Sequence, residues 1–125
     1  MEISLKGRSA LITGGSEGLG KGMAMRFAQS GADVAILARR PEVLDRAKAD
    51  LKKVSDRKVI AIPCDLLNPK ATAEAFVDAE NSLGKIDILV NNAGAIPAGN
   101  IQAVEEERWR AAWDLKVFGY INMTR

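Results

Sequence analysis

Glycines at positions 14, 18 and 20 join a short β-type run, residues 10–12, to a segment with helical periodicity. A phosphate that binds at the start of a helix must approach backbone N–H groups, and a Cβ atom on the inner side of the turn would hold it away. Glycine removes this obstruction, so the segment predicts a phosphate site. Its candidate residues are Gly14, Ser16, Glu17, Gly18, Leu19 and Gly20.

A pair of arginines follows the next β-type run, about twenty residues after Gly18. In a doubly wound sheet this position often holds an acidic side chain that binds the ribose 2′-hydroxyl of a dinucleotide, but here Ala38 is followed by Arg39 and Arg40. An arginine fork binds phosphate in a bidentate way, whereas a carboxylate repels it. Arg39 therefore favours NADP over NAD, although NAD stays possible because Glu17 is expected near the same phosphate. A solvated arginine is the alternative.

Two further segments follow the third and fourth β-type runs. After the third, Asp65 can accept from an adenine amino group and Leu66 can meet the ring, although a simple turn role for Asp65 is an equal alternative. After the fourth, Asn92 can lock a loop while Ala93 and Gly94 let the backbone approach a ribose, with an Asn-Gly-type turn as the alternative. Because parallel strands end at one edge of a sheet, these segments are expected to share one crevice.

The elements that position these residues alternate between apolar β-type runs and helix-like segments, a pattern typical of βαβ units around a parallel sheet. Strands are expected at residues 8–13, 34–38, 58–63 and 86–90, in the order 3-2-1-4, with helices on both faces. The predicted fold is α/β, an incomplete doubly wound parallel sheet. The last helix, from about Val104 to Arg125, lacks a stop signal, so residues 1–125 are expected to form a domain that is truncated within it.

The buried stripes of the first three helices follow from apolar residues at helical spacing. The predicted stripes are Leu19, Met23 and Phe27, then Leu44, Ala47, Leu51 and Val54, and then Ala73, Phe76, Val77 and Leu83.

Composition excludes several classes of protein. The 18 basic and 16 acidic residues are interspersed, so no sequence-wide charge favours nucleic acid or an anionic membrane. Cys64 is the only cysteine and histidine is absent, which excludes an internal disulfide and argues against a metal site. No apolar run approaches the length of a membrane span, and the N-terminus lacks the pattern of a signal peptide. We therefore expect a cytoplasmic protein.

These motifs together resemble the first half of a short-chain dehydrogenase/reductase. The glycine segment, Asp65, residues 91–94 and a helix with Trp109 follow in the family's order and spacing over essentially all 125 residues. The resemblance implies a Rossmann-like NAD(P)-binding fold and oxidation of an alcohol or reduction of a ketone, usually by homo-oligomers. It also implies that the glycine segment holds the pyrophosphate, that Asp65 and Leu66 hold adenine, and that residues 92–94 lie beside the ribose.

The chain departs from the family pattern in two places. The family's catalytic Tyr-x-x-x-Lys pair is not found, since the only tyrosine, Tyr120, is followed four residues later by Thr124. Seven residues after Trp109, where the resemblance implies an asparagine that orders a proton-relay water, the chain has Lys116. Lys116 is the one catalytic candidate, as a donor or by shifting a neighbour's pKa. Extension to solvent past the tryptophans is the alternative.

Two functions follow from these observations. The first is an NADP(H)-dependent oxidoreductase that acts on a small-molecule alcohol or ketone and uses this chain as its cofactor-binding half. The second is a non-catalytic NADP(H)-binding module, or an inactive fragment that lacks the Tyr-x-x-x-Lys pair. A continuation of the chain that carries this pair would distinguish them.

Overall fold

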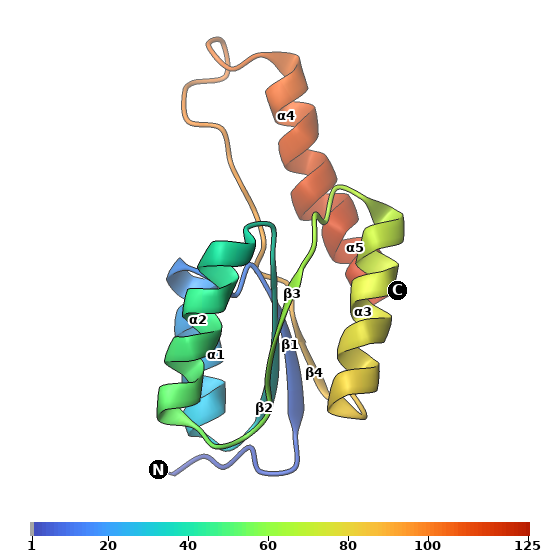
Figure 1. The fold of residues 1–125 in the computed structure, drawn as a ribbon. Helices are drawn as coiled ribbons and strands as arrows, with labels where there is room; N and C mark the ends of the chain where they lie inside the picture. The colour runs from blue at the N-terminus through green and yellow to red at the C-terminus, as the bar shows by residue number, and fades with distance from the viewer. Residues whose placement is uncertain (1) are drawn as a thin grey trace.

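A parallel sheet of four strands forms the centre of the computed structural model, which describes residues 2–125 (Figure 1). The strands follow the order β3-β2-β1-β4, and every pairing is parallel. Their bounds are β1 (Ser9–Thr13), β2 (Asp33–Ala38), β3 (Val59–Pro63) and β4 (Ile88–Val90). The predicted α/β class and strand order are confirmed, although β4 is shorter than the expected residues 86–90.

Helices cover both faces of this sheet (Figure 1). One face packs against α1 and α2, and the other packs against α3 and α5. Their bounds are α1 (Gly18–Gln29), α2 (Pro41–Val54), α3 (Pro69–Leu83) and α5 (Gly119–Thr124). The parallel strands are joined by crossover helices, as parallel pairing requires.

Strand alternation divides the core into two clusters, because successive side chains of a strand point to opposite faces. Within β2, Val34 and Ile36 belong to the cluster that includes α1 and α2. Ala35 and Leu37 belong to the cluster that includes α3 and α5. All four side chains are buried, so β2 reads as a continuous apolar run, as expected for a strand covered on both faces.

The buried face of α1 differs from the prediction. The expected stripe began at Leu19, but Leu19 is 79% exposed, and the helix buries Gly20, Ala24 and Ala28 instead. Small side chains let this helix lie close to the sheet and to the glycine segment. The prediction was wrong because it followed the size of apolar residues rather than the close approach of the backbones.

The buried faces of α2 and α3 agree only in part with the predicted stripes. In α2 the side chains of Leu44, Ala47 and Leu51 are buried as predicted, whereas Val54 is 36% exposed. In α3 only Leu83 of the predicted stripe is buried, and it lies on one face with Thr72, Ala75 and Ala79. Val77, expected inside, is 50% exposed.

The expected single helix from Val104 to Arg125 is three consecutive segments. It begins with α4 (Glu106–Trp113), continues as the π-helical segment η1 (Asp114–Phe118) and ends as α5. The N–H of Gly119 donates to the carbonyl of Asp114, the five-residue spacing of a π turn. The segment α4 extends beyond the carboxyl edge of the sheet, whereas α5 packs beside α3 (Figure 1). Within residues 2–125, no helix combines the length and the apolar character that a membrane crossing needs.

Candidate functional site

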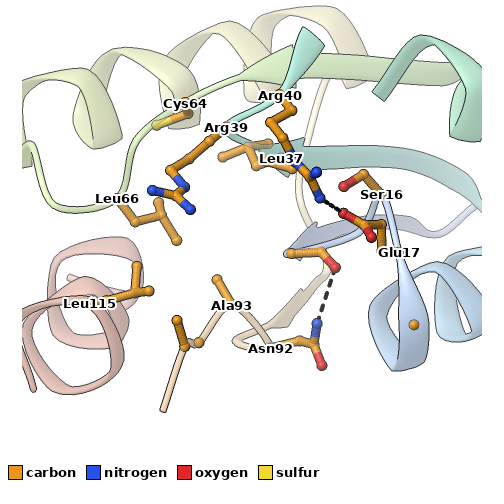
Figure 2. Close-up of a pocket in the computed structure, with 15 residues that line it drawn as sticks. Ser16, Glu17, Leu37, Arg39, Arg40, Cys64, Leu66, Asn92, Ala93 and Leu115 are labelled. Atoms are coloured by element: carbon orange, nitrogen blue, oxygen red, sulfur yellow. Dashed lines mark hydrogen bonds and ion pairs between the residues drawn. The ribbon is translucent and has the colours of Figure 1, made fainter. Parts of the chain in front are cut away.

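A cavity of about 530 Å³ lies at the carboxyl edge of the sheet (Figure 2). Its walls come from the glycine segment, the ends of β2 and β3, the loop after β4, and η1. The predicted site residues that line it are Gly14, Ser16, Glu17, Gly18, Arg39, Leu66, Asn92, Ala93 and Gly94. The remaining lining residues are Leu37, Ala38, Arg40, Cys64, Ala95 and Leu115. The four predicted segments, which are distant from one another in sequence, therefore meet at one crevice, and η1 adds Leu115 to its walls.

The three glycines of the first segment serve different purposes. Gly14 and Gly18 have φ angles of 65° and 54°, in the left-handed region that favours glycine. Gly20 is buried, and a Cβ atom there would collide with the carbonyl oxygen of Gly14. At Gly18, by contrast, no atom lies within 4 Å of the Cβ position, so its backbone borders open space. Gly20 allows the turn to pack against α1, and Gly18 leaves the cavity accessible.

Backbone N–H groups at the start of α1 are available to an acceptor. The first hydrogen bond of this helix runs from the N–H of Lys21 to the carbonyl of Glu17, at 3.1 Å. The N–H groups of Gly18, Leu19 and Gly20 precede this bond and have no acceptor within the helix. Together with the helix dipole, such groups favour an anion. Leu19 and Gly20, which the sequence analysis also placed at the site, are not among the residues that line the cavity.

Thr13 connects the glycine segment to the loop after β4, a role that the sequence motifs do not indicate. Its side chain is fully buried, and its Oγ1 accepts from the backbone N–H groups of Asn92 at 3.0 Å and of Ala93 at 3.1 Å. The same hydroxyl donates to the carbonyl of Val90 at 3.4 Å. The sequence shows a hydroxyl-bearing residue at the end of β1, but it does not show the hydrogen-bond partners of this residue, which lie almost eighty residues away in the chain.

The amide of Asn92 holds the same two segments together from the other side. Its Nδ2 donates to the backbone carbonyls of Thr13 and Gly14, each at 3.2 Å. Figure 2 shows Asn92 beside the glycine segment. The predicted locking of this loop by an amide side chain is therefore present in the structure. Because the side chain faces the glycine segment, the backbone of Ala93 and Gly94 is left to border the cavity.

Asp65 is placed in a turn and does not line the cavity. Its Oδ1 accepts from the N–H of Leu67 at 3.0 Å, and its backbone carbonyl accepts from the N–H of Asn68 at 3.0 Å. Its neighbours Cys64 and Leu66 are buried and do line the cavity. Burial raises the pKa of the Cys64 thiol, so this sulfur is neutral at physiological pH.

The two arginines after β2 point in different directions. Figure 2 shows Arg39 extending toward Leu66, whereas the guanidinium of Arg40 is paired with the carboxylate of Glu17. Both arginines line the cavity, together with Glu17. This wall therefore carries two cations and one anion, and the anion is engaged by Arg40.

Lys116 lies between the first cavity and a second one of about 250 Å³. Its Nζ is 3.6 Å from the position that a Cβ atom on Gly94 would occupy, and Gly94 lines the first cavity. The second cavity is largely apolar and is lined by Ile96, Trp109, Ala112, Trp113, Lys116 and Val117. The tryptophans and Lys116 share a face, as predicted, but Tyr120 does not line this cavity. Within residues 2–125, no group of three metal-ligating side chains is found.

Comparison with known proteins agrees with this geometry. The family model described as short chain dehydrogenase matches residues 8–125. The chain belongs to the short-chain dehydrogenase family. This short-chain dehydrogenase chain is 34% identical over 121 residues to 2,3-dihydro-2,3-dihydroxybenzoate dehydrogenase from Bacillus subtilis, an alignment that covers 97% of this chain and 46% of that protein.

Solved structures of the family share the fold of this short-chain dehydrogenase chain. L-Sorbose reductase from Gluconobacter frateurii, complexed with NADPH and L-sorbose, has a TM-score of 0.92 and 32% identity, covering 100% of this chain and 48% of that one. A short chain dehydrogenase from Burkholderia cenocepacia in complex with NADP has a TM-score of 0.90 and 36% identity, covering 96% and 49%. The chain thus spans about half the length of the relatives that it matches.

Proposed function

We propose that the cavity binds a nicotinamide dinucleotide, and that the whole protein oxidises an alcohol or reduces a ketone with it. The observation that carries the proposal is the meeting of the glycine segment, with its N–H groups at the start of α1, and the loop after β4 around one cavity. L-Sorbose reductase and the Burkholderia enzyme, both bound to NADP(H) in their crystal structures, support the choice of cofactor. Because the chain spans about half of its relatives, the activity of the whole protein is inferred from them.

The residues present fit the phosphate part of such a cofactor. Gly18 has a positive φ angle and open space where a side chain would lie, so a pyrophosphate can approach the backbone there. We assign the N–H groups of Gly18, Leu19 and Gly20 to its oxygens, with the buried Ser16 lining the same wall. The volume of about 530 Å³ lies within the usual range for ligand pockets, about 300–1,000 Å³.

The nucleoside parts fit the remaining walls. Leu66 offers an apolar surface to adenine, and we infer that the carboxylate of Asp65 accepts from the adenine amino group through the oxygen that the turn leaves free. Ala93 and Gly94 offer a backbone surface without large side chains to the ribose beside the nicotinamide. When it is bound, the nicotinamide ring gives or accepts a hydride. The chain's own residues bind and orient it.

We infer that NADP(H) is preferred over NAD(H) because of Arg39. Its guanidinium extends into the cavity and lies where a planar fork can bind a 2′-phosphate and stack on adenine. Titration calorimetry of the protein with NADPH and NADH tests this choice. Arg39→Gln should weaken NADPH binding by roughly tenfold, the size of one charge-assisted contact, and should leave NADH binding nearly unchanged. Equal loss for both cofactors would contradict the assignment.

We propose Lys116 as a catalytic residue of the whole enzyme. Its ammonium lies beside Gly94, at the border between the cofactor cavity and the apolar cavity that contains Trp109 and Trp113. From there it can donate a hydrogen bond to a substrate oxygen, or raise the acidity of a neighbouring group. Extension into solvent past the tryptophans is the structural alternative, which the kinetics of a Lys116 variant distinguish.

The non-catalytic alternative rests on Tyr120, whose carbonyl accepts from Thr124 and which has no lysine four residues later. Turnover of an alcohol or ketone with NADP(H) by the purified protein favours the enzyme. Binding of NADP(H) without turnover on a broad panel of alcohols and ketones favours the module. We also infer a homo-oligomer, since Trp113, Phe118 and Ile121 leave apolar surface exposed near the C-terminus. The single cysteine, Cys64, is free, which fits a reducing compartment and supports the inference of a cytoplasmic protein. Light scattering after size exclusion tests the oligomer.

A further inference from the structure

We propose that Glu17 competes with the 2′-phosphate of NADP(H) for Arg40, so that the Glu17–Arg40 ion pair lowers the preference of the cavity for the phosphorylated cofactor. The inference rests on the proposed function, because it concerns the same cavity. It concerns a different arginine from Arg39. It also gives a role to the one acidic side chain among the residues that line the cavity.

The ion pair joins two elements across the wall of the cavity. Glu17 is the N-cap residue of α1, and Arg40 is the N-cap residue of α2. The guanidinium Nη2 of Arg40 donates to Oε1 of Glu17, and both residues line the cavity (Figure 2). Their side chains are 58% and 59% exposed, so the pair lies in water-accessible space. An exposed ion pair of this kind is weak, and a phosphate can displace it.

The two arginines are therefore not equivalent toward a 2′-phosphate. Arg39 extends toward Leu66 and away from Glu17, whereas Arg40 already has a carboxylate on its guanidinium (Figure 2). A phosphate and a carboxylate seek the same planar fork of N–H donors. Arg40 can bind the phosphate fully only when Glu17 leaves, and the freed carboxylate then lies close to the phosphate charge.

The ribose of NAD(H) meets the same side chains differently. Its 2′-hydroxyl carries no charge and can donate a hydrogen bond to a carboxylate, the contact that an acidic residue makes in NAD-binding sites. Glu17 can accept this hydrogen bond while it stays paired with Arg40, because a carboxylate has two oxygens. The ion pair therefore weakens the binding of NADP(H) and leaves the binding of NAD(H) possible. We infer that Glu17 reduces the preference for NADP(H) over NAD(H) that Arg39 provides.

The test is the ratio of the dissociation constants for NADH and NADPH, measured by titration calorimetry on the parent protein and on Glu17→Gln. The amide keeps the shape of the side chain and removes its charge. The ratio should rise about two- to fivefold, the range that an exposed ion pair supplies. Glu42→Gln, in the first turn of α2, makes the same charge change at a residue that does not line the cavity, and should leave the ratio unchanged.

Arg40→Gln separates competition for Arg40 from simple repulsion. In this background, Glu17→Gln should raise the ratio much less than it does in the parent protein, because the cation for which the two anions compete is gone and only the direct effects of the carboxylate remain. An equal rise with and without Arg40, a rise of the same size in Glu42→Gln, or no rise at all would overturn the proposal. Thermal unfolding of each variant verifies that it is folded. A parent protein that binds neither cofactor would instead overturn the proposed function, whereas parent binding with an unchanged ratio in Glu17→Gln overturns only the role of Glu17.

Discussion

Replacing Thr13 by valine should separate the loop after β4 from the glycine segment. Valine keeps the volume of the fully buried side chain and removes the hydroxyl. The N–H groups of Asn92 and Ala93 then lose their common acceptor, at 3.0 and 3.1 Å. An unsatisfied buried donor costs about 1–3 kcal/mol. Because both donors belong to half-buried residues, the lower half of this range applies to each of them, and the free energy of unfolding should fall by about 2–4 kcal/mol in total.

Urea unfolding of Thr13→Val, Thr13→Ser and Thr72→Val measures this effect. Serine keeps the acceptor and loses one buried methyl group, so it should cost only about 1 kcal/mol. Thr72 is equally buried, but its hydroxyl makes a local hydrogen bond to the carbonyl of Asn68 at 2.9 Å, so valine there should cost about 1 kcal/mol or less. Dinucleotide affinity should fall with Thr13→Val and stay close to the parent value with Thr72→Val. A Thr13→Val protein as stable as Thr13→Ser would refute the role of the hydroxyl.

Further predictions concern the helix, the sheet edge and the catalytic candidate. Gly20→Ala places a methyl group against the Gly14 carbonyl and should lower the free energy of unfolding by about 1–3 kcal/mol. Gly22→Ala, with no atom near its Cβ position, should instead raise the free energy of unfolding by up to about 1 kcal/mol. Equal effects of the two substitutions in urea unfolding would contradict the packing argument. A hydrogen bond from the Ser9 N–H, aided by Lys85 and Arg8, lowers the pKa of Asp87. The ionised carboxylate of Asp87 stabilises the folded state above the pKa of Asp in the unfolded chain, and this stabilisation is lost as the pH falls below about 4. Asp87→Asn should therefore reduce the fall in unfolding free energy at acid pH. An unchanged fall would refute the role of Asp87. In the whole enzyme, Lys116→Asn should alter both kcat and its pH profile, and turnover that is unaltered at every pH would exclude a catalytic role for the ammonium.

Much of the sheet could be predicted from the sequence because its signals are local. The apolar run of β2, from Val34 to Leu37, indicates a strand covered on both faces, and the glycines that flank α1 mark a strand-to-helix turn. The order of the strands follows from the general rules for βαβ units. The meeting of Arg39, Leu66 and Asn92 at one edge follows in turn from that order.

The features that the sequence did not reveal depend on contacts between distant segments. The buried face of α1 uses Gly20 and Ala24 because the backbone of the glycine segment lies against it, and no periodicity of large apolar residues records that contact. Thr13 reads as an ordinary strand residue until Asn92 is placed beside it. The π turn at η1 leaves no clear pattern in residues 114–118, although it interrupts the regular α-helix that the sequence predicts there.

The most direct test of the account follows backbone amide resonances of the ¹⁵N-labelled protein during titration with NADPH. The amides of Gly18, Leu19 and Gly20 should shift strongly and saturably, because their N–H groups are assigned to the pyrophosphate. Gly22, one turn further along the helix and exposed, should shift much less. Saturable shifts confined to the cavity of Trp109 and Trp113, or none at residues 18–20 at saturating NADPH, would contradict the central claim that this turn binds the cofactor.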